Sequence, residues 1–326
     1  MNAFDFISPT SLDEVLRLLS AGARPIAGGT DLLTLIKDGI SAPPTLVSLE
    51  RIAGFSLIRE DENGLHIGAG ARIADVLAWR TLRQTYPLLA QACQYVGWPE
   101  IRAMGSIGGN LCQRPRCGYF RHPLGAQCLK RGGDRCYVPE GRADGHYAIY
   151  GGGPCWAVHP SDIAPALVAL DATVAIASHA DRRTIPVEHL FSADDVRRET
   201  IVRDDELLTA IHVPKPPHGA RAYYRKSKRR QSHDFSGVSV ALSAVVRDGV
   251  CVSARLALGS VALTPWRLHA VEQLLIGRRV DAALTEEAAR LAVRDAKPIV
   301  STRGTSNRAK VWLVEALVKR AAGVLA

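Results

Sequence analysis

Four cysteines in one irregular stretch are the residues of this sequence best suited to chemistry. They are Cys117, Cys128, Cys136 and Cys155. The stretch lies between two turn motifs, at 105–110 and 159–162, and shows no strong periodicity. A long aperiodic loop inside a compact domain usually has a function. Four thiols in such a loop indicate a metal centre that holds the loop together.

The spacing of these cysteines does not identify the metal. It contains no Cys-x-x-Cys pair, which excludes the zinc-finger, zinc-ribbon and ferredoxin patterns. A structural zinc, an iron–sulfur cluster and free thiols all remain open. Nearby cationic side chains would stabilise a negatively charged cluster. These are Arg114, Arg116, Arg121, Lys130, Arg131 and Arg135. A histidine ligand from His122, His146 or His159 is a further alternative.

Two glycine turns are the elements that would position a cofactor. The first, Gly-Gly-Thr-Asp at 28–31, follows an expected strand at 24–27 and precedes an expected helix at 32–36. Such a turn exposes backbone N–H groups and suits a phosphate, with a plain tight turn as the alternative. It is not the G-x-G-x-x-G fingerprint. The second turn, at 105–110, adds the side chains of Ser106 and Asn110 and would meet another part of a pyrophosphate.

The remaining pattern predicts an α+β fold. Ser11 is an expected N-cap for a helix at 12–19, because the apolar residues that follow share one helical face. Strands at 238–246 and 250–258 predict a hairpin around Asp248 and Gly249. Helices are expected at 270–275, 285–296 and 306–325. The segment 214–219 is a candidate linker before this smaller C-terminal domain.

Composition narrows the class of protein. The chain has 326 residues and a net charge of +9, with its densest basic cluster at 225–230. We interpret that cluster as a solvated segment or one that meets a phosphate or a partner, and we expect no nucleic acid. No apolar run is long enough for a membrane helix, and the first residues do not resemble a secretory signal. Seven cysteines without such a signal argue against a disulfide framework.

Several motifs, taken together and in order, resemble one family. They lie at 25–33, 105–111 and 160–162, followed by Tyr224-x-Lys226 and by the tripeptide at 233–235. The chain resembles, over essentially its whole length, the FAD-binding (medium) subunit of the xanthine dehydrogenase family of molybdenum hydroxylases. This resemblance implies a two-subdomain FAD-binding domain of the PCMH (vanillyl-alcohol-oxidase-like) type at 1–215. It also implies an iron–sulfur insert at 112–158 and an α+β domain of the CO dehydrogenase flavoprotein type at 216–326.

The insert points to particular branches of the family. In most members Asn110 and Asp162 would lie much closer together in sequence, and here the cysteine stretch separates them. Two branches carry a four-iron four-sulfur cluster in such an insert. They are the β subunit of 4-hydroxybenzoyl-CoA reductase and the FAD subunit of bacterial periplasmic aldehyde oxidoreductase. The segment at 113–120 and the wide gap after Cys136 look more like the second branch. The resemblance therefore implies that the four cysteines bind a 4Fe–4S cluster.

The resemblance also assigns cofactor residues. The FAD pyrophosphate would meet the first turn, which comprises Pro25, Ile26, Ala27, Gly28, Gly29, Thr30, Asp31, Leu32 and Leu33. The pyrophosphate and ribityl chain would meet Ser106, Gly108, Gly109 and Asn110. Ser161 and Asp162 would approach the adenosine ribose, Leu208 the ring system, and Lys226 a cofactor oxygen. Arg225 is the alternative to Lys226, and Cys112 lies outside the ligand pattern.

The implied function is electron transfer with partner subunits. A large subunit with molybdopterin cytosine dinucleotide would oxidise the substrate, and a small subunit with 2Fe–2S clusters would pass electrons to FAD. This chain then needs no catalytic acid or base, and His233 and Asp234 would point to opposite faces of a strand. One rival is a zinc-braced basic module that binds nucleic acid. Another is a free-standing flavin oxidase, whose longer chains carry a substrate domain. We expect periplasmic export with a signal-bearing partner, or else a cytoplasmic location.

Overall fold

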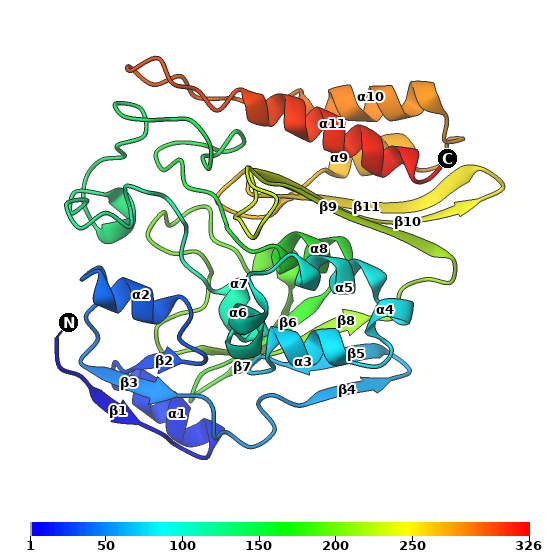
Figure 1. Ribbon diagram of the computed structural model, residues 1–326. Coiled ribbons are helices and arrows are strands. Elements are labelled where there is room, and N and C mark those ends of the chain that lie inside the picture. Colours follow the sequence, from blue (N-terminus) through cyan, green and yellow to red (C-terminus); the bar gives the residue numbers. More distant parts are fainter. Residues whose placement is uncertain (1) are drawn as a thin grey trace.

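The N-terminal part of the chain forms a small parallel sheet. The computed structural model describes residues 2–326, and Figure 1 shows the arrangement of their elements. The first unit comprises β1 (Asp5–Ile7), α1 (Leu12–Ser20), β2 (Arg24–Ile26), α2 (Leu32–Lys37) and β3 (Thr45–Ser48). Its strands lie in the order β1-β3-β2. The Ser11 hydroxyl accepts a hydrogen bond from the N–H of Glu14 at 3.3 Å, which confirms the predicted N-cap.

A second unit contains an antiparallel sheet covered by helices. Its strands, in spatial order, are β4 (Ile58–Asp61), β5 (Gly64–Gly68), β8 (Leu207–Pro214), β6 (Thr173–Ala177) and β7 (Arg182–Pro186). Its helices are α3 (Ile73–Ala78), α4 (Leu82–Thr85), α5 (Pro87–Gln94), α6 (Pro99–Met104), α7 (Ile107–Leu111) and α8 (Ile163–Ala169). A single large apolar core joins this sheet to α1, α3, α5 and α8.

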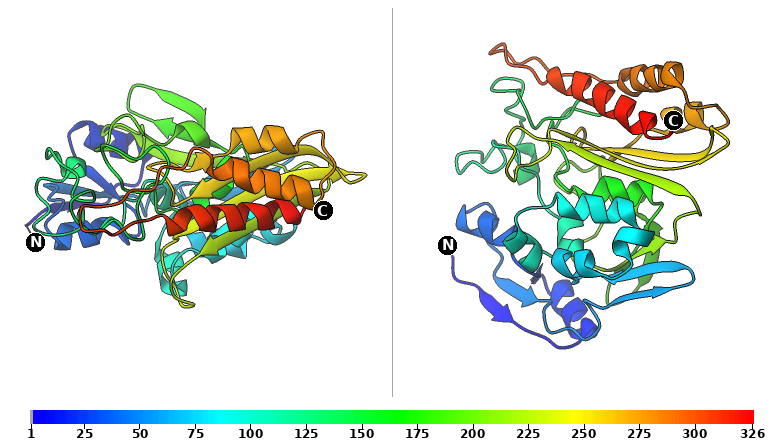
Figure 2. Two further views of the ribbon diagram at one scale, coloured as in Figure 1. Left: turned by 90° about the horizontal axis from the view of Figure 1, so that it is seen from above. Right: turned by 45° about the vertical axis from the view of Figure 1, so that its right-hand side comes forward.

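The C-terminal domain is a sheet with helices on its outer face. Its elements are β9 (Ala220–Ser227), β10 (Val238–Arg247), β11 (Val250–Gly259), β12 (Trp266–Arg267), α9 (His269–Leu275), α10 (Ala282–Val293) and α11 (Ala309–Gly323). The predicted hairpin is confirmed: β10 pairs antiparallel with β11, and Asp248 and Gly249 have φ of 51° and 78°. Helices α9 and α11 contact one face of the sheet, and α5 and α8 contact the other (Figure 2).

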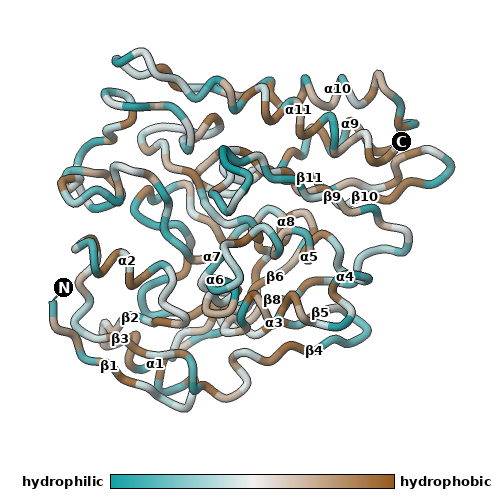
Figure 3. The backbone as a smooth tube through the Cα atoms, viewed as in Figure 1, coloured by the Kyte–Doolittle hydropathy of each residue, from teal (hydrophilic) through white to brown (hydrophobic). Residues whose placement is uncertain are grey.

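Two segments differ from the prediction. The expected turn at 105–110 is largely the short helix α7, because the Ser106 side chain caps it. His233 and Asp234 lie in the loop between β9 and β10 and not on a strand. That loop begins with the last residues of the basic cluster, 228–230, and is strongly hydrophilic (Figure 3), so no apolar face is available to pair it with a sheet.

The cysteine insert, residues 112–158, has little regular structure and is held by its neighbours. Within it the structure contains the short 3₁₀ helix η1 (Leu129–Arg131). The C-terminal domain reaches it through the segment before α11 and through the first turn of α11. The N–H of Ala143 donates to the Thr305 hydroxyl at 2.8 Å, and Asn307 Nδ2 donates to the carbonyl of Ala148 at 2.9 Å. Lys310 Nζ, which is buried, donates to the carbonyl of Tyr147 at 2.8 Å.

Within residues 2–326, no helix combines the length and apolar character that crossing a membrane demands.

Candidate functional site

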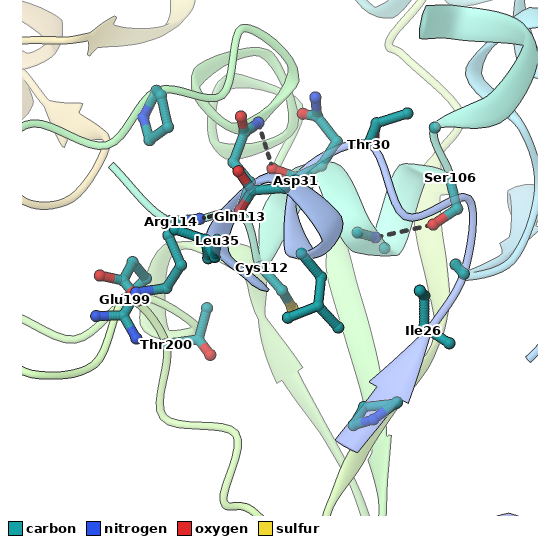
Figure 4. Close-up of a pocket in the computed structure, with 18 of the residues that line it drawn as sticks. Ile26, Thr30, Asp31, Leu35, Ser106, Cys112, Gln113, Arg114, Glu199 and Thr200 are labelled. Atoms are coloured by element: carbon teal, nitrogen blue, oxygen red, sulfur yellow. Dashed lines mark hydrogen bonds and ion pairs between the residues drawn. The ribbon is translucent and has the colours of Figure 1, made fainter. Parts of the chain in front are cut away.

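A cavity of about 1300 Å³ lies where the two glycine turns meet. Its walls come from the first turn, from α7, from α6, from the segment 195–208 and from the start of the cysteine insert. Figure 4 shows that Asp31 and Gln113 approach each other on one side of this cavity while Ser106 lies on another. Chain segments far apart in sequence therefore build one site, and its volume suits a large cofactor.

The first turn presents unpaired backbone donors to this cavity. No N–H group of residues 28–31 donates to a protein acceptor within the described part of the chain, 2–326. Gly29 has a φ of 68°, in the left-handed region, so the backbone at this residue does not follow the right-handed path of the helix α2 that comes next. Successive free N–H groups in such a turn form a concave site for an anion. The first turn therefore fits a phosphate group.

Gly28 is required for a different reason from cofactor approach. A Cβ there would overlap the backbone carbonyl of Met104, at the end of α6. The absence of a side chain lets the first turn lie against α6 and hence close to the second turn, because α6 leads directly into Ser106 and α7. Gly28 thus sets the distance between the two walls of the cavity.

The second turn uses its donors internally. The N–H of Gly108 donates to the carbonyl of Ala69 at 2.9 Å, and the N–H of Gly109 donates to the Ser106 hydroxyl at 3.1 Å. The N–H of Asn110 donates to the carbonyl of Ser106 at 2.9 Å. A Cβ at Gly109 would meet the Ser106 hydroxyl oxygen and otherwise open space. This turn therefore forms a closed wall with a smooth surface toward the cavity.

A buried polar layer supports the second turn from behind. Ser161 Oγ donates to Asn110 Oδ1 at 2.5 Å. Asp162 lines the cavity, and its carboxylate accepts from Lys226 Nζ at 2.7 Å and from the Tyr224 hydroxyl at 3.2 Å. Burial raises the pKa of Asp162, and the Lys226 ammonium opposes that shift. The buried carboxylate and the ammonium group therefore form an ion pair whose charges compensate each other within the protein.

His159 belongs to the same layer. One ring nitrogen, Nε2, lies 3.1 Å from the carbonyl of Leu111, and Nδ1 accepts from the N–H of Ser161 at 3.4 Å. The neutral ring with its proton on Nε2 satisfies both contacts. Burial lowers the pKa of His159 to about 4. His159 is therefore a neutral structural residue that joins α7 to the start of α8.

Asp31 lies at the edge of the cavity, but its carboxylate faces the insert. Oδ1 accepts from Arg116 Nη1 at 2.5 Å and from Arg121 Nη2 at 2.6 Å, and Oδ2 accepts from the N–H of Arg114 at 2.8 Å. Burial opposes ionisation, but Arg116 and Arg121 outweigh it and hold the pKa of Asp31 below its usual range. Asp31 thus ties the first turn to the residues around Cys117.

The four cysteines of the insert gather in one apolar cluster, which includes Phe120, Val138 and Tyr147. All are free thiols; Cys117, Cys128 and Cys155 are buried and Cys136 is half-buried. Within residues 2–326, no three His, Cys, Asp or Glu side chains are close enough together to hold a single metal ion.

The surroundings of the sulfurs suit thiolates once a metal replaces their protons. Burial raises the pKa of the Cys117 thiol to about 12, and that of Cys155 to about 11. Backbone N–H groups oppose this shift: those of Tyr119 and Phe120 lower the pKa of Cys117, and that of Ala157 lowers the pKa of Cys155. Those of Val138 and Trp156 act in the same direction on Cys136. Hydrogen bonds from backbone N–H groups to sulfur are a common way of stabilising metal-bound thiolates.

The cationic side chains of the insert are mostly paired with carboxylates. Glu199 Oε1 accepts from Lys130 Nζ at 2.8 Å, and Glu199 Oε2 forms an ion pair with Arg114 Nε at 2.8 Å. Lys130 is almost fully buried. The histidines weighed as ligands are engaged elsewhere. His146 Nδ1 lies 3.1 Å from the carbonyl of Ser236, and His122 Nδ1 accepts from the N–H of Leu124. Neither histidine belongs to the apolar cluster that contains the four cysteines.

Most of the residues predicted to bind a cofactor line the cavity. They are Pro25, Ile26, Ala27, Gly28, Gly29, Thr30, Asp31, Leu32, Ser106, Gly108, Gly109, Asn110, Asp162 and Leu208. Leu33 packs beside Gly29 outside the lining, Ser161 lies behind Asn110, and Lys226 acts through Asp162. Sequence reasoning missed the part of the wall formed by α6 and by the segment 195–204. Neither has a glycine or metal-ligand motif to mark it.

Comparison with protein families divides the chain into two matching parts. The family described as the FAD binding domain in molybdopterin dehydrogenase matches residues 2–216. The CO dehydrogenase flavoprotein C-terminal domain matches residues 222–324. The first match covers the glycine turns, the insert and most of the cavity wall. The second runs from within β9 to α11 and includes the cavity residues His233 and Phe235.

Individual proteins agree with this division. The chain is 36% identical to the aldehyde oxidoreductase FAD-binding subunit PaoB of Escherichia coli (strain K12) over 258 residues, which are 78% of this chain and 79% of that protein. It is 26% identical to the carbon monoxide dehydrogenase medium chain of Afipia carboxidovorans, over 93% of this chain and 90% of the relative. The fold matches reconstituted CO dehydrogenase from Oligotropha carboxidovorans with a TM-score of 0.77 and 24% identity, covering 99% and 97% of the two chains. The chain therefore belongs to the FAD-binding medium subunits of the molybdenum hydroxylases and is a subunit of an oxidoreductase.

Proposed function

We propose that this chain binds FAD in its cavity and a 4Fe–4S cluster in its insert, and transfers electrons within an aldehyde-oxidising molybdenum hydroxylase. The observation that carries the proposal is the row of unpaired N–H groups at 28–31, which opens into a cavity of about 1300 Å³. FAD, when bound, exchanges electrons singly with iron–sulfur carriers and in pairs with a two-electron acceptor.

Each wall of the cavity has its own task in holding FAD. The N–H groups of residues 28–31 donate to the pyrophosphate, since they have no protein acceptor within 2–326. Asp162 accepts from a ribose hydroxyl while Lys226 balances its charge. Leu208, which is buried at the cavity wall, offers an apolar surface for the ring system. Ser106 and Asn110 hold the opposite wall in place.

The insert supplies the cluster ligands. Cys117, Cys128, Cys136 and Cys155 share one apolar cluster, and nearby backbone N–H groups favour the thiolate form of Cys117, Cys136 and Cys155. Four thiolates are the usual ligand set of a 4Fe–4S cluster. A cluster is also larger than one ion, so its ligands need not converge as tightly as those of zinc. We therefore favour iron over the zinc-braced alternative.

The substrate and the other cofactors belong to partner subunits. A large subunit with molybdopterin cytosine dinucleotide oxidises the substrate, and a small subunit with 2Fe–2S clusters delivers electrons to this chain. Aldehydes are the proposed substrates because the identity to an aldehyde oxidoreductase subunit, 36%, exceeds the 26% to a carbon monoxide dehydrogenase chain. This chain would have no contact with the aldehyde, so it needs no catalytic acid or base.

Substitution of single cysteines tests the cluster assignment. In the chain co-expressed with its partners, changing Cys117, Cys128, Cys136 or Cys155 to Ser should remove most of the iron. Hydrogen exchange should rise across 112–155 more than in the FAD turns, because metal binding contributes folding free energy to such a loop. Iron analysis and the flavin absorption spectrum give the two readouts.

A buried thiol elsewhere provides the control. Cys251 lies in β11 and packs in the C-terminal core, so Cys251→Ser should keep its iron. Unchanged iron in two of the four insert variants would contradict the ligand set. A wild-type chain that carries zinc and no flavin would overturn the whole proposal in favour of a zinc-braced module.

We also propose that the chain reaches the periplasm by export together with a partner. A partner's twin-arginine signal would carry the folded assembly, since FAD and the cluster must be inserted before export. Cell fractionation with the partner's signal intact and deleted tests this route. A periplasmic flavin subunit only with the signal intact supports it, and a cytoplasmic subunit in both cases rejects it.

A further inference from the structure

Asp31 occupies a position that neither FAD binding nor cluster ligation explains by itself. Its backbone N–H is the last of the unpaired donors at 28–31, while its carboxylate turns away to the cysteine insert. The partners of that carboxylate flank a proposed cluster ligand: Arg116 precedes Cys117 directly, and Arg121 follows it by one turn of chain. One residue therefore contacts the two cofactor sites.

The contacts at Asp31 are well satisfied and mostly shielded from water. Both carboxylate oxygens have donors at 2.8 Å or less, and the side chain is 18% exposed. Arg121 also donates to the Thr34 hydroxyl at 3.1 Å and to the carbonyl of Pro115 at 2.8 Å. Arg116 also donates to Gln113 Oε1 at 3.2 Å. Charge-assisted bonds of this kind fix geometry more strongly than neutral ones.

We infer that Asp31 is a positioning residue that couples FAD retention to cluster loading, by holding the first glycine turn in place only when the insert is ordered. This inference rests on the proposed function. A loaded cluster would order the chain around Cys117, and that order would fix Arg116 and Arg121. The two guanidinium groups would then hold Asp31, and with it the donors of residues 28–31.

The insert also touches the cavity at a second place, through Glu199 and its partners Arg114 and Lys130. That contact reaches the segment 195–204 and not the N–H groups of the first turn. Leu35 of α2 also packs in the apolar cluster of the cysteines and lines the cavity, but it lies beyond the donors of the first turn. Asp31 is the residue among 28–31 whose side chain bonds the insert, so we assign the coupling to it. Because coupling free energies are reciprocal, FAD must favour an ordered insert as much as an ordered insert favours FAD.

The affinity of the full chain for FAD measures this coupling directly. We compare the dissociation constant of FAD for the chain with its cluster and after iron removal by a chelator. In the wild type, iron removal should weaken FAD binding roughly tenfold, within the usual range of coupling between sites. In Asp31→Asn, the ratio of the two constants should fall close to one. FAD should also slow hydrogen exchange in the insert of the wild type but not in that of Asp31→Asn.

Asp171→Asn is the matched control. Asp171 also pairs with two arginines, Arg255 at 2.7 Å and Arg267 at 3.1 Å, and it does not line the cavity. The ratio in this variant should equal that of the wild type. Arg121→Gln provides a second approach from the insert side, since Arg121 is absent from the cavity wall. It should lower the ratio as Asp31→Asn does, even if the latter folds poorly.

The outcomes separate this inference from the proposed function. Suppose that the wild type binds FAD and iron, and that iron removal changes the FAD dissociation constant equally in the wild type, Asp31→Asn and Arg121→Gln. This result overturns the coupling role and leaves the proposed function intact. A wild type without iron overturns the cluster assignment, and the coupling with it. A ratio that falls in both variants and not in Asp171→Asn supports the inference.

Discussion

The two glycine turns face the same cavity but use their backbones in opposite ways. In the first, at 28–31, no N–H group has a protein acceptor within residues 2–326. In the second, the N–H groups of Gly108, Gly109 and Asn110 all donate within the protein. Both turns have glycine pairs in sequence, so their composition does not distinguish them. The first turn leaves its donors open to the cavity, and the second forms a closed wall.

This difference decides how each turn must be supported. The open turn is bonded internally only through its carbonyls, since those of Gly29 and Asp31 accept from the N–H groups of Leu33 and Leu35. Its further support comes from the Asp31 carboxylate and the arginines of the insert. The closed turn rests on a buried polar layer that contains His159, Ser161 and Asp162. The order of the first turn should therefore depend on the order of the insert, and that of the second turn on the charges and hydrogen bonds of the buried polar layer.

The largest effect should come from removing the charge beneath the closed turn. Lys226→Met leaves the Asp162 carboxylate buried without its cationic partner, which typically costs about 3–5 kcal/mol. Urea unfolding of the variant should show this loss. The loss should shrink as pH falls, because burial raises the pKa of Asp162 and a protonated carboxyl no longer needs a cation.

Two controls sharpen that prediction. Lys228, two residues further on, donates only to the carbonyls of Gln231 and Ser232, so Lys228→Met should cost less than about 1 kcal/mol. Combining Asp162→Asn with Lys226→Met removes both charges and should recover much of the stability. If the double variant is as unstable as Lys226→Met, packing and not charge supports the closed turn.

The next effect separates the turns by adding a side chain to each. Gly28→Val drives a Cβ into the carbonyl of Met104 and should lower the free energy of unfolding by about 3 kcal/mol. The variant should also lose its flavin. Gly109→Val meets only the Ser106 hydroxyl, at 2.9 Å, so it should cost about 1 kcal/mol while still blocking FAD. Flavin content and urea unfolding measured on both variants test the contrast. Equal losses of stability would show that the two turns are packed alike.

Features whose determinants lie close together in sequence could be predicted, and features that depend on distant contacts could not. The cap at Ser11 and the hairpin at Asp248 and Gly249 were predicted because their determinants lie within a few residues. The glycine turns were also found, but which of them keeps free N–H groups was not. That depends on a partner distant in the fold, the carbonyl of Ala69 for Gly108. The role of Asp31 likewise depends on arginines of the insert, whose contact no local pattern reveals.

The smallest of these effects uses pH to loosen the closed turn alone. Burial lowers the pKa of His159 from 6.5 to about 4, so the neutral ring stabilises the native state above pH 6.5. As pH falls, the opened chain takes up a proton that the native site refuses, and this stabilisation is lost down to about pH 4. At about pH 5 the free energy of opening should be about 2 kcal/mol lower than at neutral pH.

Hydrogen exchange at the two turns checks whether this loss is local. A charged ring would place an N–H against the N–H of Ser161, so α7 and the residues around Ser161 should lose protection first. The N–H groups of Leu33 and Leu35 donate to the carbonyls of Gly29 and Asp31 in the first turn. They should keep their protection, because the pKa of Asp31 lies below its usual range and the carboxylate stays ionised at that pH. His159→Gln has no group to titrate there, and its exchange should not change with pH beyond the intrinsic chemical rate. Equal loss of protection at both turns would mean that they open as one unit, and their separate supports would then carry no separate function.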